Sequence, residues 1–330
     1  MRLPNIESIQ KSYEHVYISP HMDDVVLSCG GRIATQLSKG ESVLIVTVFT
    51  GDVNEKSRPK GRALDPLINI KRRRVEDEKA MERLGVDYIW LDYIDGIFRY
   101  RPPILRYGLH MRVMDKERKL CEALHDDIRK ICMAARNKRL YLPLGVGQHV
   151  DHQILFQVGR RLKHWGKHDF ELYFYEDVVY VLLPNALKYR MKLIGINIGS
   201  ITSENDLTQK KSVVQGIVEL YKAIVSVPTL KLDNPLLKPI VFIFLMLSII
   251  FMVCLLKPRA GALGRWDISP EVFDISSGMK EKLEAILEYS SQLNAPFWNR
   301  ETMGHSLARY SQAIGGSEGQ YLERYWRIVS

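Results

Sequence analysis

Short apolar runs alternate with helical patterns through the first 180 residues of this 330-residue chain. Apolar and β-branched runs predict strands at residues 16–19, 42–50, 87–91, 139–142 and 172–175. Apolar residues at helical spacing predict helices at residues 25–37, 72–84, 115–136 and 151–162. Strand alternating with helix requires crossover connections, so the pattern predicts an α/β fold: a mostly parallel sheet with helices on both faces.

Two clusters of histidine and carboxylate side chains follow strands of this predicted sheet. The first is Ser19-Pro20-His21-Met22-Asp23-Asp24, and the second is Gly147-Gln148-His149-Val150-Asp151-His152. Because ligands of such sheets bind beyond the carboxyl ends of the strands, the residues expected near one another are His21, Asp23, Asp24, His149, His152, Glu176 and Asp177. Imidazole and carboxylate together suit zinc and its first-row neighbours, and three protein ligands leave a position for water.

The spacing of the second cluster leaves two role assignments open. One of His149 and His152 can bind the metal, while the other, kept protonated, stabilises a developing oxyanion. In the first cluster His21 and Asp24 can face one point while Asp23 takes a proton from water.

The composition is that of a globular protein, with 46% hydrophobic and 26% charged residues. The cysteines show no disulfide or zinc-finger spacing and the first residues show no signal peptide, so we expect a cytoplasmic catalytic part. The net charge of +9 is concentrated between Asp52 and Arg74, where eight basic residues outnumber three acids. No nucleic-acid-binding motif accompanies them, so nucleic acid is not expected as a partner, whereas phosphate or anionic lipid is compatible.

A long apolar stretch interrupts the α/β pattern. Residues 239–256 carry no charge and would be about 27 Å long as a helix, just enough to span hydrocarbon. A single crossing would put the helix expected at 279–293 on the wrong side of the membrane, so we expect the stretch to dip into one leaflet or to lie in the interface. Residues from about 206 to 227 predict an amphipathic helix on the same surface. A buried core helix is the alternative for residues 239–256.

Several motifs resemble the PIG-L/LmbE-like family of metal-dependent sugar N-deacetylases. Residues 19–31 are similar to its opening motif, residues 143–152 to its second motif, and residues 73–77, 84–85, 95, 175–180 and 282–292 to further segments. The similarity covers residues 15–185 and 270–327, and it departs from the family at Met22 and Val179, where proline is usual. It implies a Rossmann-like fold. The resemblance does not explain residues 196–265, which we interpret as a hydrophobic membrane-associating insert that divides a discontinuous catalytic domain into residues 1–195 and 266–330.

The resemblance also implies roles for individual residues. The implied ligands of zinc, with Fe²⁺ as the alternative metal, are His21, Asp24 and His152. The implied general base is Asp23, and the implied charged group near the tetrahedral intermediate is His149. The implied substrate contacts are Arg73 and Asp95.

Together these features predict a hydrolase that removes the N-acetyl group from an amino sugar of the N-acetylglucosamine type. The insert places the enzyme at the cytoplasmic face of the cell membrane and suggests a lipid-linked substrate, whose phosphate or headgroup would suit the basic residues at 56–74 and Arg99, Arg101, Arg106 and Arg112. A soluble acetylated glycoside fits nearly as well. Two rival classes are another metallohydrolase, such as a phosphoesterase, and a non-catalytic membrane-associated scaffold. The sequence leaves the oligomeric state open.

Overall fold

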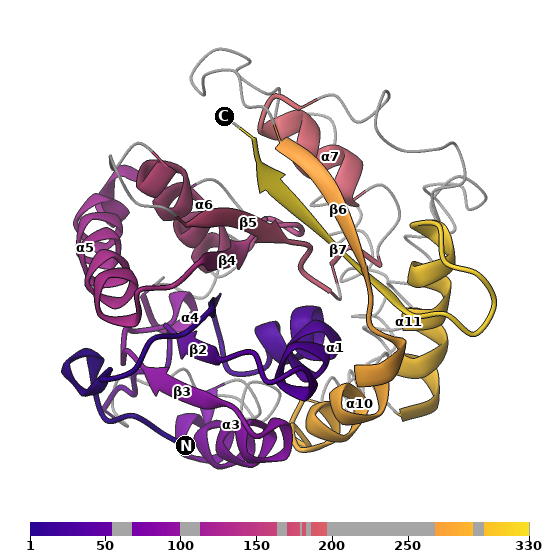
Figure 1. Cartoon of the computed structure of the whole chain (residues 1–330). Helices are drawn as coiled ribbons and strands as arrows, with labels where there is room; N and C mark the ends of the chain where they lie inside the picture. Colours follow the sequence, from indigo (N-terminus) through magenta and orange to yellow (C-terminus); the bar gives the residue numbers. More distant parts are fainter. Residues whose placement is uncertain are drawn as a thin grey trace, which may run out of the picture.

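A central sheet flanked by helices organises the computed structural model of the chain (Figure 1). The structure describes residues 1–54, 68–99, 113–163, 170–178, 180–182, 186–196, 268–292 and 300–329.

The sheet has seven strands in the order β3-β2-β1-β4-β5-β7-β6. The parallel strands are β1 (His15–Ser19), β2 (Val43–Thr47), β3 (Asp87–Trp90), β4 (Arg139–Pro143) and β5 (Glu171–Tyr175). β7 (Leu322–Ile328) pairs antiparallel with β5, and β6 (Ile268–Asp274) pairs antiparallel with β7. The chain runs from β1 outward to β3 and then returns to β4 on the other side of β1. The strand order therefore reverses between β1 and β4, and this is where ligands of such sheets bind.

Helices cover both faces of the sheet (Figure 1). One face carries α1 (Asp24–Ser38), α3 (Ile70–Leu84), α10 (Met279–Leu287) and α11 (Arg300–Ala313), and the other carries α5 (Arg118–Ala135) and α6 (Val150–Lys163). The shorter helices are η1 (Ile6–Ser8), α4 (Gly96–Arg99), η5 (Asp115–Glu117), α7 (Ala186–Leu193) and η8 (Ser276–Gly278). β1 and β2 are buried along their whole length, as parallel strands covered on both faces must be. The predicted α/β class with a mostly parallel sheet is confirmed.

The boundaries of α3 illustrate how local sequence sets an element. Asn69 caps the helix, because its side-chain oxygen accepts a hydrogen bond from the Arg72 amide at 3.1 Å. The helix ends at Gly85, whose φ of 69° lies in the left-handed region that glycine adopts without cost. The helix predicted from residue 72 thus begins two residues earlier, and its predicted end is confirmed.

The last helical prediction is too long. The helix expected at 279–293 ends at Leu287, because the chain then turns to bring Ser290 and Ser291 onto α3. The hydroxyls of both serines donate to the buried carboxylate of Glu76, at 2.9 and 2.6 Å. This contact joins the C-terminal part of the chain to the N-terminal helices.

The C-terminal strands were not predicted. Residues 321–327 were expected only to pack, and they form most of β7, which lies between β5 and the edge strand β6. Glu176, at the end of β5, holds this strand in place. Its carboxylate accepts hydrogen bonds from Arg324 Nε at 2.7 Å, Trp326 Nε1 at 2.8 Å and the Tyr310 hydroxyl at 2.7 Å. Glu176 is thus a buried anchor between β5, β7 and α11.

No helix within the described ranges is both long and apolar enough to cross a membrane. The predicted amphipathic helix, at about 206–227, and the predicted membrane-associating stretch, 239–256, lie outside the described residues, and both stay predictions.

Candidate metal centre

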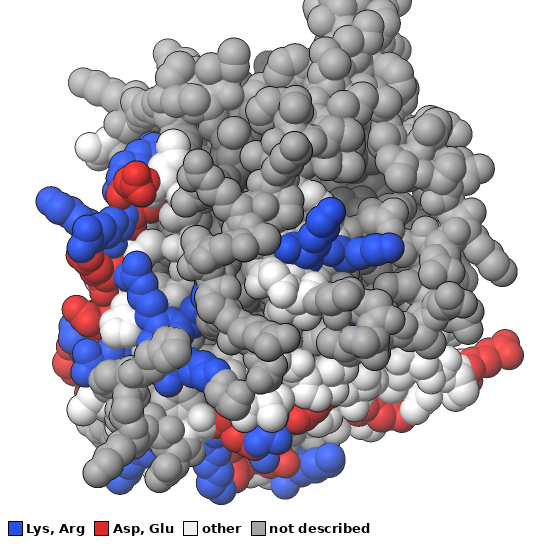
Figure 2. All heavy atoms as spheres, turned by 90° about the horizontal axis from the view of Figure 1, so that it is seen from above, with Lys and Arg blue, Asp and Glu red and all other residues white. Residues whose placement is uncertain are grey.

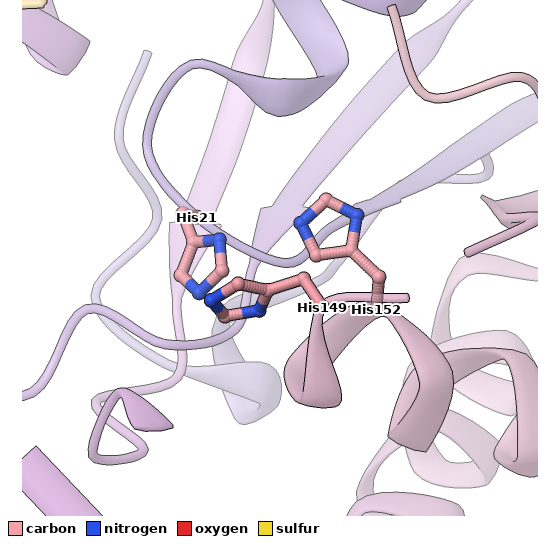
Figure 3. Close-up of side chains that lie close together, drawn as sticks. All are labelled: His21, His149 and His152. Carbon is pink, nitrogen blue, oxygen red and sulfur yellow. The ribbon is translucent and has the colours of Figure 1, made fainter. Parts of the chain in front are cut away.

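Three histidines meet at the carboxyl end of β1, where the strand order reverses. His21 follows β1, His149 precedes α6, and His152 lies in the first turn of α6. Figure 3 shows the three rings turned toward one another, and one ring nitrogen of each lies within 4.8 Å of the others. The two clusters predicted from the sequence therefore form one site.

Two of these histidines, His21 and His152, contact the same carboxylate oxygen of Asp24. Its Oδ2 atom lies 3.0 Å from His21 Nδ1 and 3.3 Å from His152 Nε2. Asp24 is also the first residue of α1, where the partial positive charge of the helix N-terminus stabilises a carboxylate. Two imidazole nitrogens and one carboxylate oxygen are thus gathered within hydrogen-bonding distance, which is the donor set of a three-ligand zinc site.

The opposite nitrogen of each of these two rings contacts a buried carboxylate. His21 Nε2 lies 3.0 Å from Asp151 Oδ2, and His152 Nδ1 lies 2.5 Å from Asp177 Oδ1. Such a carboxylate fixes the orientation and tautomer of a metal-binding histidine and increases its basicity. The ring nitrogens nearest Asp24 are therefore His21 Nδ1 and His152 Nε2, and these are the ones available to a metal.

The two supporting carboxylates are themselves held by further donors. Asp151 accepts from Arg99 Nη2 at 2.6 Å and from the Gly96 amide at 2.9 Å. Asp177 Oδ2 accepts from the backbone amides of Gly145 and Val146, at 2.7 and 2.8 Å. Asp177 was expected near the site from its position in the sequence, but no role was expected for the carboxylate of either Asp151 or Asp177. The only signal was their position: Asp151 lies inside the second motif and Asp177 follows β5.

The electrostatics of the cluster reflect these close contacts. Burial disfavours the imidazolium forms, yet the surrounding carboxylates raise the pKa of His21 well above its usual value and the pKa of His152 to about 9. Burial likewise opposes the charged form of Asp24, but the two histidines hold the pKa of its carboxyl well below the usual range. The carboxylates around the two rings therefore favour positive charge at this site.

Asp23, the predicted general base, lies beside this group in an unusual backbone conformation. Its φ of 138° is uncommon for any residue other than glycine. Its Oδ1 atom lies 3.4 Å from Nη2 of the buried Arg73, which also donates to the Met22 carbonyl at 3.1 Å. Burial raises the pKa of Asp23 to about 7, against the lowering effect of Arg73. Met22, which replaces the proline usual in the resembled motif, is fully buried in the core.

The predicted substrate contacts are both buried at the site. Arg73 holds Asp23 and the Met22 carbonyl, and Asp95 Oδ2 lies 3.6 Å from His21 Nε2 while its Oδ1 accepts from the Ile97 amide at 2.8 Å. Asp95, Asp151 and His21 form a second group with metal-ligand spacing. Because Asp151 already accepts from Arg99, Gly96 and His21, the group around Asp24 is the better candidate for a metal.

Most of the basic residues singled out from the sequence are paired or lie outside the described residues. Arg72 pairs with Glu76, and Arg74 with Asp92 and the Thr50 carbonyl. The basic positions lying outside are Lys56, Arg58, Lys60, Arg62, Arg101, Arg106 and Arg112. Figure 2 shows basic side chains interspersed with acidic ones at the left margin of the described surface. Arg99, predicted to suit phosphate, supports Asp151 instead.

Removing the charge of Asp177 tests the supporting role of the carboxylates. Asp177→Asn is expected to weaken zinc binding by about 10- to 100-fold, because His152 loses the partner that orients its ring. Competition with a chromophoric chelator measures the affinity. The matched control is Asp126→Asn, an exposed position on α5. Equal zinc affinity in Asp177→Asn and the unmodified protein would contradict the role.

Comparison with known proteins connects this geometry to a family. Residues 16–163 match the model of the PIG-L family, described as GlcNAc-PI de-N-acetylase. The chain is 27% identical over 190 residues to 2'-N-acetylparomamine deacetylase of Niallia circulans, a match that covers 50% of this chain and 66% of that protein. The chain thus spans slightly less than two thirds of this relative.

Solved structures share the fold. A deacetylase of the teicoplanin biosynthesis pathway superposes with a TM-score of 0.61 at 20% identity, covering 96% of this chain and 97% of that one. The A40926 pseudoaglycone deacetylase superposes with a TM-score of 0.59 at 17% identity, covering 96% and 97%. A further structure, with a TM-score of 0.60 at 19% identity and 96% and 97% coverage, is the zinc-inhibited form of teicoplanin deacetylase. The match to the PIG-L family model includes both motif clusters, which the fold gathers at the switch point of the sheet.

Proposed function

We propose that this protein is a metal-dependent N-deacetylase that removes the acetyl group from an amino sugar of the N-acetylglucosamine type. The observation that carries the proposal is the convergence of His21 Nδ1 and His152 Nε2 on Asp24 Oδ2, each ring supported from behind by a buried carboxylate. The matched family model and the curated relative are both named for removal of an N-acetyl group from an amino sugar or aminoglycoside, which supports this substrate class.

The donor set fits zinc, with Fe²⁺ as the alternative. His21, Asp24 and His152 would hold the ion, because two imidazoles and one carboxylate suit first-row metals and the second carboxylate on each ring fixes its orientation. When bound, such an ion polarises the amide carbonyl and lowers the pKa of a water molecule toward 7.

In this proposal Asp23 takes the proton from the attacking water. The water oxygen forms the new bond to the acyl carbon, and the carbon–nitrogen bond then breaks to release acetate and the free amine. Arg73, 3.4 Å from Asp23, keeps the carboxylate in place at the start of α1. The proton held by Asp23 goes on to the leaving nitrogen, so the carboxyl group acts first as base and then as acid.

His149 is proposed to stabilise the oxyanion. Its ring is 4.9 Å from that of His21 and 5.3 Å from that of His152, centroid to centroid, so it borders the same small space. The Asp151 amide donates to His149 Nδ1 at 3.3 Å, so the proton on Nε2 is the one that would be donated to the oxygen on which negative charge develops. The two histidines of the second cluster are given different roles because their surroundings differ. His152 contacts the buried carboxylate of Asp177, whereas His149 lies at the end of the loop that precedes α6.

The proposal also includes a membrane location for the substrate. Its support is the sequence of residues 239–256 alone, eighteen positions without a charge. A lipid-linked acetamido sugar would then be presented to the catalytic domain at the cytoplasmic face of the membrane. A soluble acetylated glycoside remains the competing substrate.

Acetate release tests the proposed reaction. Metal-loaded protein is assayed on free N-acetylglucosamine, a nucleotide-linked form and a lipid-linked form in detergent, with His21→Ala in parallel. Release that depends on His21 supports the deacetylase, and preference for the lipid-linked form supports the membrane substrate. No release from any of the three substrates by protein holding one metal per chain would contradict the proposed function, and two metals per chain would favour a phosphoesterase.

A further inference from the structure

Arg190, on α7, is a buried arginine beside the loop that leads to His149. Its side chain is almost completely buried, with 4% of the residue exposed. Within the described ranges it forms no ion pair with an acidic side chain, and its Nη2 atom has no hydrogen-bond partner. Burying a guanidinium without a carboxylate at ion-pair distance is costly, and the nearby charge of Asp177 offsets only part of that cost, because burial still lowers the pKa of Arg190.

The guanidinium contacts both ends of the loop between β4 and α6, residues 144–149, called here the β4–α6 loop. Its Nε atom donates to the Leu144 carbonyl at 2.7 Å, and its Nη1 atom lies 3.3 Å from Gln148 Oε1. Its carbon Cζ lies 4.4 Å from the centroid of the Phe156 ring on α6. One side chain thus joins the first residue of the loop, the residue just before His149, and the helix that follows.

The β4–α6 loop needs such support because Gln148, unlike the glycines of the loop, is held in a backbone conformation that is unfavourable for a residue with a side chain. Gly145, Gly147 and Gln148 all have positive φ, and Gln148 at 63° is not a glycine. A Cβ at Gly145 would lie only 2.8 Å from Arg190 Nη2, so glycine is needed there to let the guanidinium lie against the backbone. Residues in sparsely populated conformations persist where surrounding contacts over-determine them, and they cluster at active sites.

Asp177 and Arg190 contact different parts of the loop, and Gln153 Nε2 also donates to the Gln148 carbonyl. Asp177 binds the amides of Gly145 and Val146 and also orients His152, so it serves the metal ligand and the first half of the loop. Arg190 instead reaches Gln148, in the second half, next to His149. We infer that Arg190 is a positioning residue that fixes the β4–α6 loop so that His149 faces the reacting acetamido group, an inference that rests on the proposed function of His149.

If Arg190 positions the loop, Arg190→Met should lower kcat while KM and zinc affinity change little. We expect kcat to fall by about 10- to 100-fold, because misplacing a catalytic group by about 1 Å has an effect of that size. KM should change little, since His149 is proposed to act on charge that develops only in the transition state. Zinc affinity should stay within about twofold, because Asp177 still holds His152. Arg190→Met removes a buried charge, which is favourable, but it leaves the Leu144 carbonyl and Gln148 Oε1 without this donor, so the two effects oppose each other and Tm should change little.

Hydrogen–deuterium exchange gives a readout that is independent of activity. A peptide covering residues 144–149 should exchange at least about tenfold faster in Arg190→Met, while peptides from α5 and the central strands are unchanged. Lys192→Met is the matched control, because it removes an exposed basic charge from the same helix. Methylguanidine should restore part of the lost kcat to Arg190→Ala but not to His149→Ala. Arg190→Lys should rescue less than half of the loss, since a single ammonium cannot contact Leu144 and Gln148 together.

These measurements test the positioning role of Arg190 separately from the proposed deacetylase function on which it rests. Unchanged exchange of residues 144–149 in Arg190→Met, or a parallel loss of kcat, zinc affinity and Tm, would overturn the positioning role. Faster exchange confined to this loop supports it even if the unmodified protein releases acetate from no acetamido sugar, and that second result would instead count against the proposed function.

Discussion

Asp23→Asn is expected to lower kcat by about 10³-fold while the metal stays bound. The proposed reaction needs a carboxylate that accepts the proton of water, and an amide at this position accepts none. Asparagine has nearly the same size and tolerates positive φ better than most residues, so the fold should be preserved. Turnover on an acetamido sugar and zinc content per chain, both measured on the same preparation, test the expectation.

The control for this substitution is Asp126→Asn, which changes an exposed carboxylate on α5. It should leave turnover and zinc content as they are. Near-normal turnover in Asp23→Asn would show that another group takes the proton. Loss of zinc together with turnover would instead indicate that Asp23, and not Asp24, is a metal ligand.

His152→Ala is expected to have the largest combined effect. It removes one proposed metal ligand and also leaves the buried carboxylate of Asp177 without its closest side-chain partner. We expect zinc affinity to fall at least about 100-fold and acetate release to become undetectable. Leaving a buried charge unpaired should also lower the free energy of unfolding by about 3 kcal/mol or more. Zinc content after gel filtration and denaturant unfolding measure the two effects.

His125→Ala provides the matched histidine control, because His125 lies on α5, is only partly buried and is outside the group of histidines and carboxylates at the site. It should retain zinc and activity. To separate folding from metal binding, His152→Asn keeps a polar side chain that can donate to Asp177. Zinc affinity equal to that of the unmodified protein in both His152 variants would exclude His152 as a ligand.

The fold and the position of the site could be predicted because their signals are local. Each parallel strand is a short apolar run followed by a helical pattern, and strand ends in such a sheet lie at one edge. His21 and His149, 128 positions apart in the numbering, could therefore be placed together without knowing any contact. The end of α3 could be predicted for the same reason, because its terminating glycine follows the helix directly, whereas the Asn69 cap and the start at Ile70 were missed.

What could not be predicted depends on pairs that form only after folding. Asp177 supports His152, 25 residues earlier, because β5 lies beside β4. Glu176, at the same strand end, points its carboxylate to β7 instead, and no pattern in the sequence distinguishes these two neighbours. The basic residues show the same limit: Arg73 and Arg99 read as charges available to a substrate, but both are turned inward onto carboxylates of the site.

Anomalous diffraction from crystals of the zinc-loaded protein locates the metal. It therefore tests directly whether one metal ion is held by His21, Asp24 and His152. We expect a single zinc peak per chain at this site, with Nδ1 of His21, Nε2 of His152 and an oxygen of Asp24 each at about 2.0–2.2 Å. A peak on the opposite side of the His21 ring, between Asp95 and Asp151, or no ordered zinc at either place, would contradict it.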